Sequence, residues 1–248
     1  MKTTIKYLIN FYKHPDFDKS YNNLSYSQQL KELIQVYFIT LLVVFTLSIL
    51  NLILVKTGIV NSYHSIVDIN DANNTNMLKW YYIFGLFLTP IFEEISFRLL
   101  LTKFNARLIS ISLSLIFGTL LYNLIRYHLF IFNSPIIQNL SFYFYPILFA
   151  IPIFFIFNLI KFRFRNHWNT FFPYVFYFFN IIFAFFHLFR LSVHFNDIVF
   201  LPIILSQYFV LGVSFGYIRI KLGILYSIIF HFVWNFPYFL IKLLEIYK

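Results

Sequence analysis

The sequence predicts an all-α integral membrane protein, a polytopic bundle of about seven transmembrane helices with room for an eighth. Of its 248 residues, 60% are hydrophobic and 24% are aromatic. Only 11% are charged, far fewer than the roughly 25% of soluble proteins, and the mean hydropathy is +0.75. The apolar residues also gather in runs of about 17 to 25, the length at which a helix crosses the hydrocarbon core of a bilayer.

Seven such runs follow one another along the chain. They cover approximately Leu33–Val55, Trp80–Phe104, Leu108–Tyr127, Phe142–Ile160, Phe171–Phe189, Ile198–Tyr217 and Leu222–Leu244. Prolines inside membrane helices are tolerated because neighbouring helices satisfy the freed backbone groups. We therefore expect kinks within the runs at Pro90, Pro146, Pro152, Pro202 and Pro237. Residues 33–248 are predicted to form one transmembrane domain.

The first 32 residues differ from the runs, because they mix basic with apolar positions. They lack the small-residue cleavage site of a secretory signal, so we interpret them as an amphipathic arm at the membrane interface, in which an eighth, shorter membrane element could lie. The clearly polar loop extends from Asn61 to Asn76, with the sequence DINDANNTN at its centre.

The net charge of +10 is carried between the apolar runs, where basic residues set the orientation of a membrane protein. A cytoplasmic N-terminus places most of the lysines and arginines on the cytoplasmic side. The sequence thus predicts a multi-pass protein of the cell (inner) membrane that binds membrane lipid and no nucleic acid. The absence of cysteine excludes disulfides and catalysis by a cysteine nucleophile.

The segment EEISFR places two acids and an arginine within an apolar run. Ionisable side chains in the hydrocarbon are costly and default to a functional interpretation. Glu94 and Arg98 are four residues apart, so they share one helix face and can neutralise each other. Glu93 has no such helical partner, and a carboxylate in apolar surroundings holds a proton more tightly than in water, which suits a general base.

Three further polar residues lie in later runs. His187 follows Phe183 by four residues, and His231 and Asn235 share one face of the last run. Each alone is more typical of a hydrogen-bonded structural residue. Together with Glu93, they are the groups that activate a water molecule and hold a tetrahedral oxyanion.

These motifs, EExxxR (Glu93, Glu94 and Arg98), FxxxH (Phe183 and His187) and HxxxN (His231 and Asn235), occur in this order. The chain thereby resembles the CPBP family of intramembrane proteases, which includes CAAX prenyl endopeptidases and bacteriocin-processing (Abi) proteins. The resemblance extends over roughly Pro90 to Pro237, within a protease-like core at about residues 80–240. Gly212, Gly216 and Gly223 precede the third motif as they do in the family, and simple helix packing is the preferred interpretation of the first two.

The resemblance implies an endopeptidase that hydrolyses a membrane-associated peptide, which in some members is lipid-modified. It assigns water activation to Glu93 and His187, oxyanion binding to His231 and Asn235, and supporting roles to Glu94 and Arg98. No cofactor is expected, with zinc held by glutamate and histidine as the alternative.

One feature departs from the family pattern. The helix after EExxxR carries Phe117 followed four residues later by Leu121, and His187 comes two runs further on. Either a helical hairpin has been inserted between the motifs, or the second motif is lost and His187 only resembles it. The sequence FAFFHL favours an insertion. The residues alone also leave open a non-catalytic membrane protein of the same fold, such as an immunity factor, scaffold or transporter.

Overall fold

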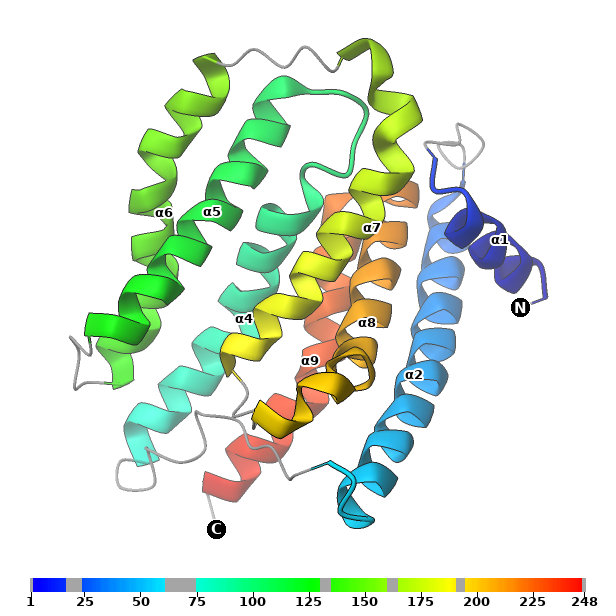
Figure 1. Ribbon diagram of the computed structural model, residues 1–248. Helices are drawn as coiled ribbons and strands as arrows, with labels where there is room; N and C mark the ends of the chain where they lie inside the picture. Colours follow the sequence, from blue (N-terminus) through cyan, green and yellow to red (C-terminus); the bar gives the residue numbers. More distant parts are fainter. Residues whose placement is uncertain are drawn as a thin grey trace. The chain divides into compact units, whose positions relative to one another are not determined.

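The computed structural model describes residues 2–16, 24–60, 75–129, 135–159, 165–190 and 195–246 (Figure 1). Every regular element in these ranges is a helix. Five stretches are long and apolar enough to cross a membrane: Tyr26–Lys56, Ala106–Ile125, Arg165–Phe189, Ile198–Lys221 and Ile224–Ile241. This confirms the predicted all-α, membrane-embedded fold. Most of the predicted polar loop from Asn61 to Asn76 lies outside the described residues.

Each of the seven predicted runs falls largely on one long helix. These helices are α2 (Tyr26–Lys56), α4 (Thr75–Arg98), α5 (Ala106–Leu129), α6 (Pro135–Leu159), α7 (Trp168–Phe186), α8 (Leu201–Lys221) and α9 (Ile224–Ile246). The N-terminal arm contains α1 (Lys2–Lys13), and short 3-10 turns lie at η2 (Arg165–His167), η3 (His187–Arg190) and η4 (Phe195–Phe200).

The element boundaries correct the predictions in three places. Helix α4 ends at Arg98, six residues before the predicted Phe104, and a turn follows in which the Leu101 amide bonds to the Arg98 carbonyl at 3.1 Å. Pro202 lies in the first turn of α8, where its missing N–H costs no helical hydrogen bond, so it starts the helix and does not kink it. Helix α7 ends at Phe186, so His187 begins a 3-10 turn.

The chain divides into two compact units. The first comprises Met1–Asn70 and Phe171–Gly223, and therefore holds α1, α2, most of α7, and α8. In it α2 packs along α8, and the Thr40 hydroxyl donates to the Ser214 hydroxyl at 2.9 Å. Phe183 of α7 meets Phe215 of α8 edge to face. A left-handed Gly223 (φ 106°) ends α8, with its amide bonded to the carbonyls of Ile218 and Arg219.

The second unit comprises Asp71–Thr170 and Ile224–Lys248. Its helices form two closely packed pairs, α4 with α9 and α5 with α6, and α4 also contacts α5 and α6 (Figure 1). The aromatic rings of Phe87 and Phe232 pack between α4 and α9 at 5.2 Å, and those of Tyr122 and Tyr145 stack between α5 and α6 at 5.9 Å. The α4–α9 pair brings the first and third sequence motifs together.

Candidate functional site

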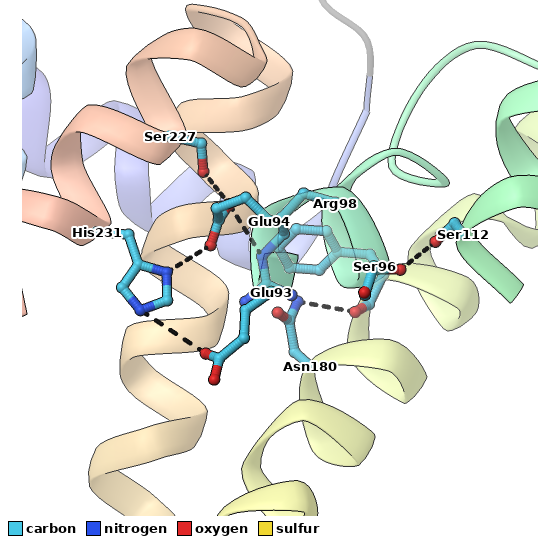
Figure 2. Close-up of polar contacts among 9 residues, drawn as sticks. Glu93, Glu94, Ser96, Arg98, Ser112, Asn180, Ser227 and His231 are labelled. Carbon is cyan, nitrogen blue, oxygen red and sulfur yellow. Dashed lines mark hydrogen bonds and ion pairs between the residues drawn. The ribbon is translucent and has the colours of Figure 1, made fainter. Parts of the chain in front are cut away.

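The candidate site lies within the second unit, where the C-terminal part of α4 meets α9 (Figure 2). Glu93, Glu94 and Arg98 occupy the last two turns of α4, and His231 comes from the first half of α9. Helix α4 contains Pro90 one turn before these acids, which leaves the Leu86 carbonyl without its usual helical donor. The packing of α4 on α9 places Glu93, Glu94 and Arg98 among apolar helices.

Glu94 is the centre of the site's hydrogen bonds. Its side chain is fully buried. One carboxylate oxygen, Oε1, lies 3.0 Å from Nδ1 of His231, and the other, Oε2, accepts a hydrogen bond from the Ser227 hydroxyl. Arg98 Nε lies 3.8 Å from the same Oε2. The helical Glu94–Arg98 pair expected from the sequence is present, and α9 adds two more partners to the same carboxylate.

The Glu94–Arg98 ion pair is needed for stability because both side chains are fully buried. The Arg98 side chain is 0% exposed, and an uncompensated buried charge is strongly destabilising. The arginine offsets the negative charge of Glu94, while Ser227 and His231 supply hydrogen bonds to the carboxylate. Glu94 is thereby held in one position on the α4–α9 contact.

This arrangement fixes the orientation of the His231 ring. Because a carboxylate oxygen accepts, Nδ1 is the nitrogen that carries hydrogen toward Glu94. In the neutral ring Nε2 then holds the lone pair, and this nitrogen lies 3.7 Å from Oε2 of Glu93. Figure 2 shows the ring between the two glutamates, one on each nitrogen.

The 3.7 Å separation between Glu93 Oε2 and His231 Nε2 has a chemical consequence. It is too long for a direct hydrogen bond, yet one water molecule can lie at about 2.8 Å from both atoms. Both side chains are largely buried, with 8% of Glu93 and 4% of His231 exposed. The pair can thus hold one water molecule at a site largely withdrawn from solvent.

Asn235 lies one turn beyond His231 on α9 and is half-buried. The four-residue spacing keeps the two side chains on one face of the helix. Its amide can donate two hydrogen bonds. Helix α9 is continuous over both residues, so the prediction that they share a face is confirmed.

His187 belongs to the first unit, and its surroundings there are well defined. Its Nδ1 donates to the Phe183 carbonyl at 3.0 Å, and its ring stacks on Tyr208 of α8 at 4.1 Å with an interplanar angle of 25°. The hydrogen on Nδ1 leaves Nε2 as the acceptor in the neutral ring. Phe183 of the FxxxH motif thus contributes a backbone oxygen as well as its ring, which lies edge-on to the imidazole.

Several residues have roles that the sequence did not predict. Ser227 lies one turn before His231, and this four-residue spacing was the available signal for its place beside the histidine. Nothing in the sequence indicated Tyr208 as the stacking partner of His187. Ser112 of α5 donates to the Ser96 carbonyl of α4, a contact that only the packing of the two helices creates.

Zinc binding is the alternative use of these residues. Glu93 and His231 offer two ligand atoms, and a catalytic zinc site takes three protein ligands. Within the described parts of the chain, no group of three or more His, Cys, Asp or Glu side chains is placed to hold a metal ion.

Comparison of the chain with protein-family models, with curated proteins and with solved structures finds no match.

Proposed function

We propose that the protein is an intramembrane endopeptidase, similar to the CPBP proteases, that hydrolyses a peptide bond with a water molecule held by Glu93. The observation that carries this proposal is the 3.7 Å separation of Glu93 Oε2 and His231 Nε2 in a buried site. A hydrolytic water needs a base on one side and, next to it, a donor for the oxyanion that develops. Glu93 offers the base, and His231 offers the donor when its ring carries hydrogen on both nitrogens.

The reaction proceeds in two steps. The Glu93 carboxylate takes a proton from water, the resulting hydroxide adds to the peptide carbonyl carbon, and the carbonyl oxygen becomes an oxyanion. His231, in its protonated form, donates from Nε2 to this oxygen, and Asn235 adds an amide N–H. The carbon–nitrogen bond then breaks, and Glu93 passes its proton to the departing amine. No covalent intermediate with the protein is needed.

The neighbouring residues support these roles. Glu94 stabilises the His231 imidazolium through Nδ1, as the orienting carboxylate does in other catalytic triads. The resemblance to the CPBP family assigns His187 a part in activating the water together with Glu93, and we propose the same role here. Arg98 supports Glu94. No step passes through a metal, so a chelator should leave cleavage unchanged; loss of cleavage on chelation would favour zinc.

The displaced second motif is consistent with an insertion. Helices α5 and α6, which separate Glu93 from the FxxxH motif, pack closely against each other. A self-packed helical pair is what an inserted hairpin would form. We therefore propose that all three motifs are retained and that α5 and α6 are the addition.

The proposed setting is the cell (inner) membrane. The protein would cross it seven times, with α4 and α6 as the two spans besides the five stretches described above, and the N-terminus would be cytoplasmic. The substrate would be a membrane-bound peptide or protein, lipid-modified or not, cut from the cytoplasmic side. Basic residues at the end of α8, Arg219 and Lys221, agree with a cytoplasmic position for that end.

A membrane proteomics experiment tests the proposal. Membranes from cells with the wild-type protein, without it, and with Glu93→Gln are compared for peptides whose termini change. A peptidase predicts at least one membrane peptide that is processed only in the wild type. If every terminus is the same in the wild type and in Glu93→Gln, the proposal is wrong.

A non-catalytic membrane protein is the second candidate, and one observation favours it. Glu94 is fully buried and already bonded to Ser227, His231 and Arg98. Joining α4 to α9 would by itself be a sufficient role for this network. An immunity factor, scaffold or transporter of this fold would keep its function in Glu93→Gln, whereas the peptidase would lose it.

A further inference from the structure

We infer that α1 is a binding surface for anionic phospholipid, which seats the N-terminal helix at the headgroup level of one leaflet. This inference does not rest on the peptidase proposal. It depends only on the membrane-embedded fold and on contacts within the first unit.

One face of α1 is fixed to the protein. Leu8 and Phe11 are buried, with 2% and 4% of their surfaces exposed. The Phe11 ring packs edge to face on Phe176 and on Tyr217, at 5.3 and 5.0 Å. The Thr4 hydroxyl donates to the Gln35 side chain. Helix α1 is therefore docked, and its remaining faces have defined directions.

The docked position lies near the ends of two membrane helices. Gln35 is in the first third of α2, and Tyr217 lies one turn before α8 ends at Lys221. At a rise of 1.5 Å per residue, Tyr217 is only about 6 Å from the end of its helix. Figure 1 shows α1 beside the N-terminal part of α2. In a helix that spans a membrane, positions this close to an end are expected where the bilayer changes from hydrocarbon to headgroups.

The outer faces of α1 are divided between apolar and basic residues. Ile5 and Ile9 are 36% and 48% exposed and lie one turn apart, so they form an apolar strip. Lys6 and Lys13 are exposed and seven residues apart, which places them on nearly the same line of the helix. By helical geometry this basic line lies roughly 60 to 80° from the isoleucine strip. Helix α1 itself contains no acidic residue.

The apolar strip and the basic line together match an anionic lipid surface. An apolar strip beside a basic line is the pattern of a helix that lies in the interface, with its isoleucines in the acyl region and its lysines at the phosphates. The chain's net charge of +10 adds to the attraction for an anionic surface. Phosphatidylglycerol or a similar anionic lipid satisfies both faces at once, whereas an uncharged leaflet leaves the lysines without partners.

The absence of cysteine in the chain makes a clean test possible. Ile9→Cys is labelled with a bimane fluorophore, and the protein is reconstituted into phosphatidylcholine vesicles that contain phosphatidylglycerol. Bromine is placed on the acyl chains of either lipid at equal total bromine content. Ile5→Cys serves as a second label on the same strip, and Asn10→Cys as a matched control about 100° around the helix.

The inference predicts strong quenching at position 9 or 5, weaker quenching at position 10, and more quenching by brominated phosphatidylglycerol than by brominated phosphatidylcholine. The double variant Lys6→Gln/Lys13→Gln should lose this preference, by roughly fivefold for each lysine, and Lys6→Arg/Lys13→Arg should keep it. Absence of quenching at both positions 9 and 5 would overturn the inference. So would equal quenching by the two brominated lipids in the wild type, with no change in the Lys6→Gln/Lys13→Gln variant.

Discussion

The Nδ1 atom of His231 lies 3.0 Å from the Oε1 atom of Glu94, and this contact joins the third sequence motif to the first. It turns the other ring nitrogen toward Glu93, 3.7 Å away. Two adjacent glutamates on one helix thus have different tasks: one holds the histidine ring, and the other faces the position where a water molecule can bind.

Replacing each glutamate in turn should separate these tasks. Glu94→Gln leaves Arg98 buried without its carboxylate, so we expect a loss of about 3–5 kcal/mol, seen as a clearly lower midpoint of thermal unfolding in detergent. Glu93→Gln should cost less than about 1 kcal/mol, because an amide can replace the carboxylate as a hydrogen-bonding partner. Tryptophan fluorescence on heating measures both. Equal destabilisation by the two variants would mean that Glu93 is structural as well.

Ser227 is expected to act through Glu94 as a positioning residue. Its hydroxyl donates to Glu94 Oε2, and Ser227→Ala removes one bond to a charged group, which should reduce peptide cleavage roughly tenfold. Ser227→Thr keeps the hydroxyl and should restore most of the activity. The matched control is Ser114→Ala, because Ser114 is also buried but donates to the Ser110 carbonyl of its own helix at 2.6 Å. An equal loss of cleavage in the control would contradict the positioning role.

The close approach of α5 and α6 depends on Gly118. A Cβ at this position would clash with the Pro146 carbonyl oxygen and lie 3.1 Å from the Ala150 nitrogen, both backbone atoms of α6. Gly118→Ala should therefore force the two helices apart and lower stability by about 1–3 kcal/mol.

Gly85 provides the matched control for this substitution. Its Cβ would meet the Phe239 ring at 2.9 Å, and a side chain can move where a backbone cannot. Gly85→Ala should thus have the smaller effect on thermal unfolding. If both variants unfold at the wild-type temperature, the α5–α6 contact is not as close as described.

Tyr12 in the N-terminal helix should make stability fall at alkaline pH. Burial raises the pKa of its phenol to about 12, although a hydrogen bond with Ser214 acts in the opposite direction. The unfolded phenol ionises near pH 10, so the contribution is complete below pH 10 and is lost as the pH rises from about 10 to 12. Tyr12→Phe should remove this part of the pH dependence. Identical profiles of unfolding temperature against pH in the two proteins would contradict the expectation.

The sequence was sufficient for the helices and for part of the site. Apolar runs of membrane length predicted the seven long helices of the described residues, because the requirement to satisfy backbone groups in lipid leaves few other structures. The Glu94–Arg98 pair followed from helical spacing alone. Helix ends were less predictable: the run continued in composition to Phe104, but α4 ended at Arg98.

The contacts between helices could not be predicted in the same way. That Glu94, and not Glu93, receives the His231 Nδ1 hydrogen bond depends on the rotation of α9 against α4, and an apolar pattern that surrounds the whole helix does not define such a rotation. The same is true of the stacking of Tyr208 on His187. Both contacts are set by how one helical segment packs on another.

The decisive measurement is the cleavage rate of purified Glu93→Gln relative to wild type. The substrate is the peptide that the proteomics comparison identifies, and both proteins are reconstituted in the same lipid with matched unfolding temperatures. Removal of a general base should slow cleavage by about 10²–10⁴-fold, and in ¹⁸O-water the wild type should place one heavy oxygen in the new carboxylate. Cleavage by Glu93→Gln at the wild-type rate would contradict the account.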